Sequence, residues 1–179
     1  SILPKPWPGS TSVPAAVAGI VTANKIKNEI NNPIFEWVNS NEYINSGKTY
    51  DVVLRALNRW NSVITGIPTN KPIQFTFALS DDLEPGVLGA AQLTKYIIKD
   101  TLEIKDLNEE NYFNDLQNRN IGEVFPYSGE IILNRTTWNS KLDDIDEFNN
   151  PRVYYILLHE IGHLLGIGPL WILYGILLY

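Results

Sequence analysis

Two hydrophobic patterns stand out in the middle of the chain. Apolar residues recur at helical spacing over residues 49–65 and alternate with polar residues over 73–79. The first pattern predicts a long amphipathic helix, with Thr49 as its N-cap and Gly66 as its stop, because positions three and four apart share one helix face. The second predicts a β-strand, which the turn-forming residues 81–86 end.

Shorter patterns predict the remaining elements. Residues 96–98 and 102–104 fit a pair of short strands, and 130–134 fit another strand. The Asn-, Asp- and Glu-rich stretch 106–120 predicts a loop with a brief helix, and residues 17–30 fit either a short helix or a strand. Together these elements predict an α+β fold.

A second long helix is predicted near the C-terminus. Asn150 is its expected cap and Pro151 its first-turn residue, and Gly166 and Gly168 are expected to end it. The helix is apolar around most of its circumference, which is typical of a buried helix. A polar linker is expected between the 130–134 strand and this helix.

Composition limits the class of protein. The 179 residues are 44% hydrophobic and 19% charged, as in a globular domain, and the net charge of −6 argues against a nucleic-acid partner. The sequence contains no cysteine and therefore no disulfide. Residues 1–48 are expected to form an N-terminal arm and irregular segment, and 49–179 a single folded unit. No signal peptide is visible in the sequence.

The C-terminal helix carries the pentapeptide HEIGH, with His159, Glu160 and His163, and the chain has no other histidine. Two histidines four positions apart project from one face of a helix, which is the arrangement of zinc ligands in H-E-x-x-H hydrolases. Glu160 could then act as general base toward a water activated by the metal. The alternative is an ordinary helix that carries two histidines by chance.

Four segments together resemble leishmanolysin-like zinc metalloproteases of the metzincin group. They are HEIGHLLGIGPLW at 159–171, RWNSVITG at 59–66, GVLGAA at 86–91 and PYSGEI at 126–131, in the family's order along the chain. The first is specific, whereas the other three are individually weak. Within the second segment, Arg59 and Trp60 are expected to be packing residues.

The resemblance implies a zincin-like N-terminal subdomain, in which the long helix and the zinc helix pack on a mixed twisted sheet. It implies Zn²⁺ held by His159 and His163, catalysis by Glu160, and a peptide or protein substrate that adds to an edge strand. Residues 131–134 are the expected edge by position, with an ordinary structural strand as the alternative. Members of this family also include secreted and surface proteins.

The chain departs from the family at the third zinc ligand. Many metzincins place a histidine where this sequence has Pro169, whereas leishmanolysin-like members take it from further downstream. A truncated protease domain or a borrowed ligand would account for the difference. Carboxylates just before the helix are candidates for this ligand, namely Asp143, Asp144, Asp146 and Glu147. Such clusters, however, are commonly solvated charge. A non-catalytic remnant that acts as a binding or structural domain is the alternative function.

The chain also contains an apolar C-terminal stretch and a glycosylation sequon. Residues 170–179 carry no charge but are too few to span a membrane, so they are expected to pack on a protein surface. Asn134-Arg135-Thr136 fits the N-glycosylation sequon, and glycosylation of this asparagine requires a secretory route.

Overall fold

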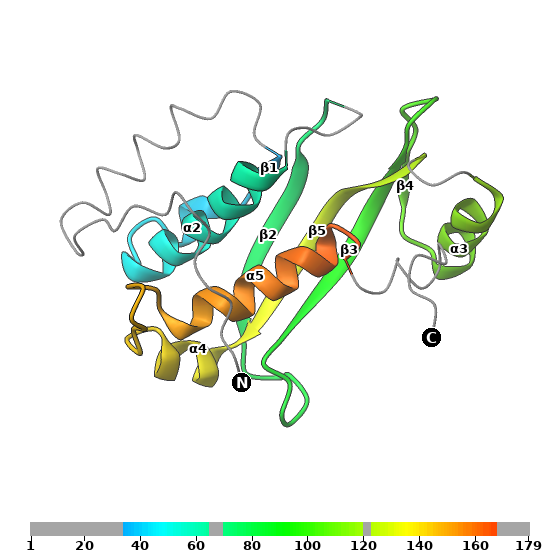
Figure 1. Ribbon diagram of the computed structural model, residues 1–179. Helices are drawn as coiled ribbons and strands as arrows, with labels where there is room; N and C mark the ends of the chain where they lie inside the picture. Colours follow the sequence, from blue (N-terminus) through cyan, green and yellow to red (C-terminus); the bar gives the residue numbers. More distant parts are fainter. Residues whose placement is uncertain (1–33, 65–69, 120–122, 168–179) are drawn as a thin grey trace.

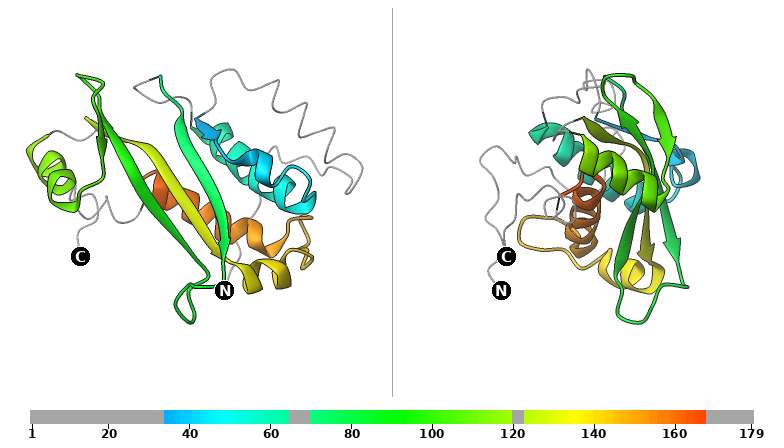
Figure 2. Two further views of the ribbon diagram at one scale, coloured as in Figure 1. Left: turned by 180° about the vertical axis from the view of Figure 1, so that it is seen from behind. Right: turned by 90° about the vertical axis from the view of Figure 1, so that its right-hand side faces the viewer.

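The computed structural model describes residues 34–64, 70–119 and 123–167. Within them a five-stranded mixed sheet carries α2 and α5 on one face (Figures 1 and 2). In chain order the elements are β1 (Phe35–Trp37), the 3-10 turn η1 (Ser40–Glu42), α2 (Lys48–Val63), β2 (Ile73–Ser80), β3 (Gly89–Ile98), β4 (Ile104–Asp106), α3 (Glu109–Asn118), β5 (Val124–Asn134), α4 (Arg135–Lys141) and α5 (Arg152–Leu164). The α+β class is confirmed.

The sheet has the strand order β1-β2-β5-β3-β4. Strands β1, β2 and β5 are parallel, and β3 runs antiparallel to both β5 and β4. Strand β4 covers only Lys95–Ile97 of β3, and the N–H of Leu107 donates to the carbonyl of Thr94 at 2.9 Å. Among the described residues, the outer edge of β3 therefore has no strand partner from Gly89 to Leu93.

The prediction that residues 131–134 form the edge strand was wrong. These residues end β5, which pairs with β2 on one side and with β3 on the other. Their near-continuous apolar character is typical of a strand buried between neighbours. The open edge belongs instead to the first half of β3. Only the last three residues of this strand, 96–98, were predicted to be a strand.

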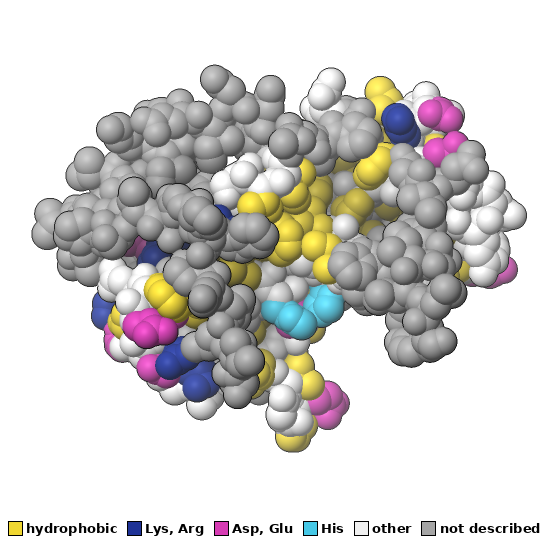
Figure 3. Space-filling view, viewed as in Figure 1, with side chains coloured by type: hydrophobic (Ala, Val, Ile, Leu, Met, Phe, Trp, Pro, Cys, Tyr) yellow, Lys and Arg dark blue, Asp and Glu magenta, His cyan; other side chains and the backbone are white. Residues whose placement is uncertain are grey.

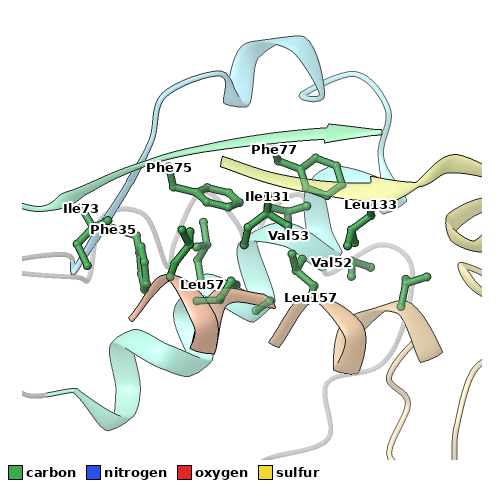
Figure 4. Close-up of a cluster of buried hydrophobic side chains, with 14 of the residues drawn as sticks. Phe35, Val52, Val53, Leu57, Ile73, Phe75, Phe77, Ile131, Leu133 and Leu157 are labelled. Atoms are coloured by element: carbon green, nitrogen blue, oxygen red, sulfur yellow. The ribbon is translucent and has the colours of Figure 1, made fainter. Parts of the chain in front are cut away.

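The main core lies between the sheet and its two covering helices (Figure 4). The alternation in β2 puts Phe75 and Phe77 on the helix side, where both are fully buried. Burying side chains of this size contributes roughly 1.5–3 kcal/mol each. The labelled members of the cluster are Phe35, Val52, Val53, Leu57, Ile73, Phe75, Phe77, Ile131, Leu133 and Leu157. Because Phe35 is one of them, the chain before α2 also contributes to this core.

Thr49 is not the N-cap of α2. The helix begins at Lys48 after Gly47, and the buried Thr49 hydroxyl accepts a hydrogen bond from the Trp138 indole at 3.1 Å. Trp138 belongs to α4, which occupies the stretch predicted to be a polar linker. The Asn134 side chain caps α4 by accepting from the N–H of Thr137 at 2.9 Å. The sequon asparagine is thus engaged in a helix cap.

The predicted cap of α5 was also wrong. Pro151 occupies the N-cap position and makes no side-chain cap. The Asn150 side chain instead accepts from Arg55 of α2 and donates to the Tyr155 hydroxyl at 3.4 Å. The N–H of Arg152, at the start of the helix, donates to the carbonyl of Asp144 at 2.9 Å. The start of α5 is therefore fixed by the preceding loop and by α2.

Helix α3 lies at the far end of the sheet (Figure 1), and the partly buried carboxylate of Asp115 attaches it there. Asp115 accepts from the Tyr96 hydroxyl at 2.7 Å and from the Lys105 ammonium at 2.9 Å. Burial by itself would raise the pKa of Asp115, but these hydrogen bonds outweigh it and hold the pKa below its ordinary value. The ionised form of Asp115 is therefore the one that stabilises the native state.

We expect this network to make stability depend on acid pH. Because the native pKa of Asp115 lies below its unfolded value of about 3.9, its contribution is present above that pH and is lost as pH falls through the native pKa. Replacing Asp115 by Asn should cost roughly 1.5–3 kcal/mol at pH 7, the usual contribution of hydrogen bonds to a charged group. Urea unfolding between pH 7 and pH 2 checks this. Equal pH slopes for Asp115→Asn and the wild type would contradict it.

Candidate metal centre

Helix α5 is positioned by a close contact with α2. The Trp60 indole N–H donates to the carbonyl of Leu158 at 3.1 Å. Its ring packs on Gly162, where an added Cβ would lie 3.3 Å from Trp60 Cζ2. The packing role predicted for Trp60 is confirmed. These contacts flank the two histidines, because Leu158 precedes His159 and Gly162 precedes His163.

The two histidines lie side by side at the surface, next to a hollow with apolar side chains around it (Figure 3). Their Nε2 atoms are 2.9 Å apart and their ring planes are inclined by 84°. Two nitrogens bound to one tetrahedral zinc ion at about 2.0–2.1 Å would be roughly 3.3 Å apart. A small rotation of either ring would give that separation, so the residues fit a shared metal ion.

The second histidine is oriented by the turn that ends α5. Nδ1 of His163 is 3.0 Å from the carbonyl oxygen of Ile167. A carbonyl only accepts, so Nδ1 carries the proton and, in the neutral ring, Nε2 keeps its lone pair. Metal-binding histidines in proteins commonly have such a partner on the other nitrogen, which fixes the ring and its tautomer.

Gly166 makes this turn possible. It has φ +84°, and it allows the N–H of Ile167 to donate to the carbonyl of Gly162 at 2.9 Å while its own N–H donates to the carbonyl of His163 at 3.0 Å. This pair of bonds is the Schellman ending of a helix. The predicted stop at Gly166 is confirmed, and Gly168 lies outside the described residues.

We expect Gly166→Ala to weaken zinc binding as well as the fold. A side chain at this φ costs about 1–2 kcal/mol, and relaxing the turn moves the Ile167 carbonyl away from His163. Loss of such a partner typically lowers metal affinity by roughly 10–100-fold. Zinc titration with a competing chromophoric chelator measures the change.

The matched control is Gly86→Ala. Gly86 has φ +87° and nothing within 4 Å of an added Cβ, so the substitution strains the backbone similarly in a different turn. It should lower stability without altering zinc affinity. An equal loss of affinity in both variants would contradict the role of the turn.

Glu160, next to His159 on α5, packs against the first residue of β3. It is 8% exposed, and its Cγ would lie 3.3 Å from a Cβ added at Gly89, the first residue of β3. Within the described part of the chain, its carboxylate makes no hydrogen bond or ion pair. The site therefore combines two ring nitrogens with a carboxylate next to the open edge of β3.

The other proposed ligands are not at this site. Asp143 pairs with Lys48, and Asp144 lies 3.7 Å from the Arg152 guanidinium. Asp146 accepts from the Tyr155 hydroxyl and from two backbone N–H groups of its own loop. The fourth candidate, Glu147, is solvent-exposed. Among residues 34–64, 70–119 and 123–167, no group of three or more His, Cys, Asp or Glu could hold a metal ion.

Comparisons with protein-family models, with curated proteins and with solved structures find no match. The resemblance to leishmanolysin-like proteases therefore remains a prediction from the four sequence segments. Its Pro169 and Trp171 positions lie outside the described residues. In the part of the chain that the structure describes, no helix is long and apolar enough to cross a membrane.

Sequence reasoning missed two contributors to the site. The Ile167 carbonyl could not be recognised because a backbone oxygen has no sequence signature, although a glycine three residues after His163 hinted at a turn. The contact between Gly89 and Glu160 joins residues 71 positions apart, and only the glycine itself indicated a close approach.

Proposed function

We propose that this chain is the zinc-binding subdomain of a metallopeptidase, with His159 and His163 as metal ligands and Glu160 as general base. The observation that carries the proposal is the pair of Nε2 atoms 2.9 Å apart, on the same helix as Glu160, whose side chain packs beside the open edge of β3. Zinc sites of this class use three protein ligands and a water. The two histidines provide two, and the third ligand must come from outside the described residues.

Each residue has a defined role in peptide hydrolysis. A zinc ion supplies Lewis-acid activation of water and of the scissile carbonyl. Glu160 takes the proton from the attacking water and returns it to the leaving amine. His163 is held in the ligating tautomer by the Ile167 carbonyl, and Trp60 holds α5 against α2.

The substrate strand is expected along the outer edge of β3. Asn134 N–H donates to the carbonyl of Leu88 at 2.9 Å, so even-numbered residues at this end of β3 point their backbone groups toward β5. By alternation, the backbone groups of Gly89, Ala91 and Leu93 point outward. An extended peptide pairing with them would pass beside Glu160.

Ala91→Pro tests this placement. Proline at this position removes an N–H that points outward and leaves the hydrogen bonds between β3 and β5 intact. Edge strands tolerate such a proline. We expect kcat/KM for peptides to fall about tenfold, the equivalent of roughly one hydrogen bond, with little change in the unfolding midpoint. Ala91→Ser, which keeps the N–H, should behave like the wild type. Unchanged kcat/KM in the proline variant would exclude β3 as the substrate edge.

The test of the proposed function combines metal content with peptide cleavage. Zinc should bind with a stoichiometry of one, and His163→Ala should abolish stoichiometric binding. Cleavage of an unstructured peptide library should stop with chelator and return with zinc. Zinc binding without cleavage in any longer form of the chain would favour the non-catalytic scaffold instead. Absence of zinc binding would overturn the peptidase proposal and leave only the scaffold.

A further inference from the structure

The histidine pair provides half of a zinc coordination sphere. Its two Nε2 atoms lie 2.9 Å apart on one face of α5, and a structural zinc ion takes four protein ligands in a tetrahedral arrangement. In the ranges that the structure describes, no third His, Cys, Asp or Glu joins the pair to form a possible metal site. Two coordination positions therefore remain for ligands from outside the described residues.

Both rings can be reached from the solvent. His159 is exposed and His163 is half-buried, and Figure 3 shows the two side by side at the surface of the molecule. Nδ1 of His163 is 3.0 Å from the Ile167 carbonyl oxygen, so Nε2 is the atom left for a metal ion. An ion held by the pair would lie at the surface, where a second protein molecule can approach it.

Helix α5 brings few charges to the surface around the pair. In a two-fold dimer each surface patch contacts the same patch of the other copy, so a charged patch would meet a like charge. Besides the histidines, α5 carries only Arg152 and Glu160 as charged residues. Arg152 lies two turns before His159, and Glu160 packs toward β3. One turn before His159 on the same face are the uncharged residues Tyr155 and Ile156.

We propose that two copies of this chain share one zinc ion, with His159 and His163 of each copy as its four ligands. The inference rests on the metal binding of the proposed function, but not on the peptidase activity. Four ring nitrogens satisfy the tetrahedral preference of zinc, and a two-fold axis through the ion makes the two copies equivalent. Because this arrangement leaves no position for water, the shared form would not hydrolyse peptides.

Zinc titration followed by sedimentation velocity tests the shared site. The mass should double from 20.3 kDa as zinc approaches half an equivalent per chain. A large excess of zinc should return monomers with one ion each, because mass action then favours separate occupancy. Chelator should also return monomers. A mass that keeps rising in excess zinc, or a dimer that persists in chelator, would overturn the shared site.

The same titration separates this inference from the proposed function. A chain that stays monomeric at every ratio while binding one zinc ion would overturn the shared site and leave the peptidase proposal intact. A wild-type chain that binds no zinc would overturn both.

His159→Ala removes one ligand from each copy at an exposed position, so the fold should be retained, which circular dichroism checks. With only one ring nitrogen from each copy, the variant should remain monomeric throughout the titration. Glu147→Ala is the matched control, because it removes an exposed side chain away from the pair, and it should form dimers like the wild type. Zinc-dependent dimers of His159→Ala at the wild-type level would overturn the proposal.

Discussion

Replacing Glu160 by glutamine is expected to lower kcat/KM for peptide hydrolysis by about 10²–10⁴-fold, the usual contribution of a general base. The amide has nearly the same shape as the carboxylate but cannot take a proton from water. Because Glu160 lies beside Gly89 and makes no hydrogen bond or ion pair with the described residues, removing its charge should leave the fold unchanged or slightly more stable. The measurement is steady-state cleavage by the zinc-loaded protein.

Two controls separate this result from loss of metal or of structure. Zinc affinity of Glu160→Gln should match the wild type, since the two histidines are unchanged. Glu130→Gln, on β5 and partly exposed, should retain full activity. Cleavage that persists at the wild-type rate in Glu160→Gln would eliminate the general-base role and, with it, the proposed mechanism.

The second large effect is expected from Gly89→Ala. The new Cβ would lie 2.2 Å from Leu133 Cδ2, in the buried core, and 3.3 Å from Glu160 Cγ. Overpacking of this kind costs about 1–3 kcal/mol. Displacing a catalytic group by about 1 Å can lower the rate on the order of 100-fold. We therefore expect both a lower unfolding midpoint and a large fall in kcat.

Gly129→Ala provides a control with a similar clash elsewhere. Its Cβ would lie 2.3 Å from Leu164 Cδ2 and 3.1 Å from the carbonyl oxygen of Gln92, without contacting Glu160. It should lose comparable stability but keep most of its activity at a temperature where it remains folded. Similar losses of activity in the two variants would show that stability alone is responsible.

Periodicity predicted the elements whose buried faces are long and regular. The helix that became α2 and the strand that became β2 were found because their apolar positions repeat over several turns or pleats. Helix α4 was missed because its seven residues carry a single buried side chain, Trp138, and otherwise resemble a loop. Thr49 and Asn150 were misassigned as caps because tertiary partners, Trp138 and Arg55, engage their side chains instead.

The juxtaposition of the two histidines could be predicted because it is local. Two residues four positions apart share a helix face in any fold, so His159 and His163 needed no tertiary information. The strand next to them could not be predicted in the same way. Whether β3 or β5 lies at the edge depends on strand order, which joins residues far apart in sequence and is not encoded in any single segment.

The short open edge of β3 has a consequence for the kind of protein that could be cut. Among the described residues, pairing is available only from Gly89 to Leu93, after which β4 and the chain that follows it take over, and five residues of strand extend about 17 Å. A target segment must be extended over this length, so a segment that is packed in the folded target must first open locally. For an intact protein, the free energy of that opening would decide where and how fast it is digested, and a target stabilised by its own ligand should resist.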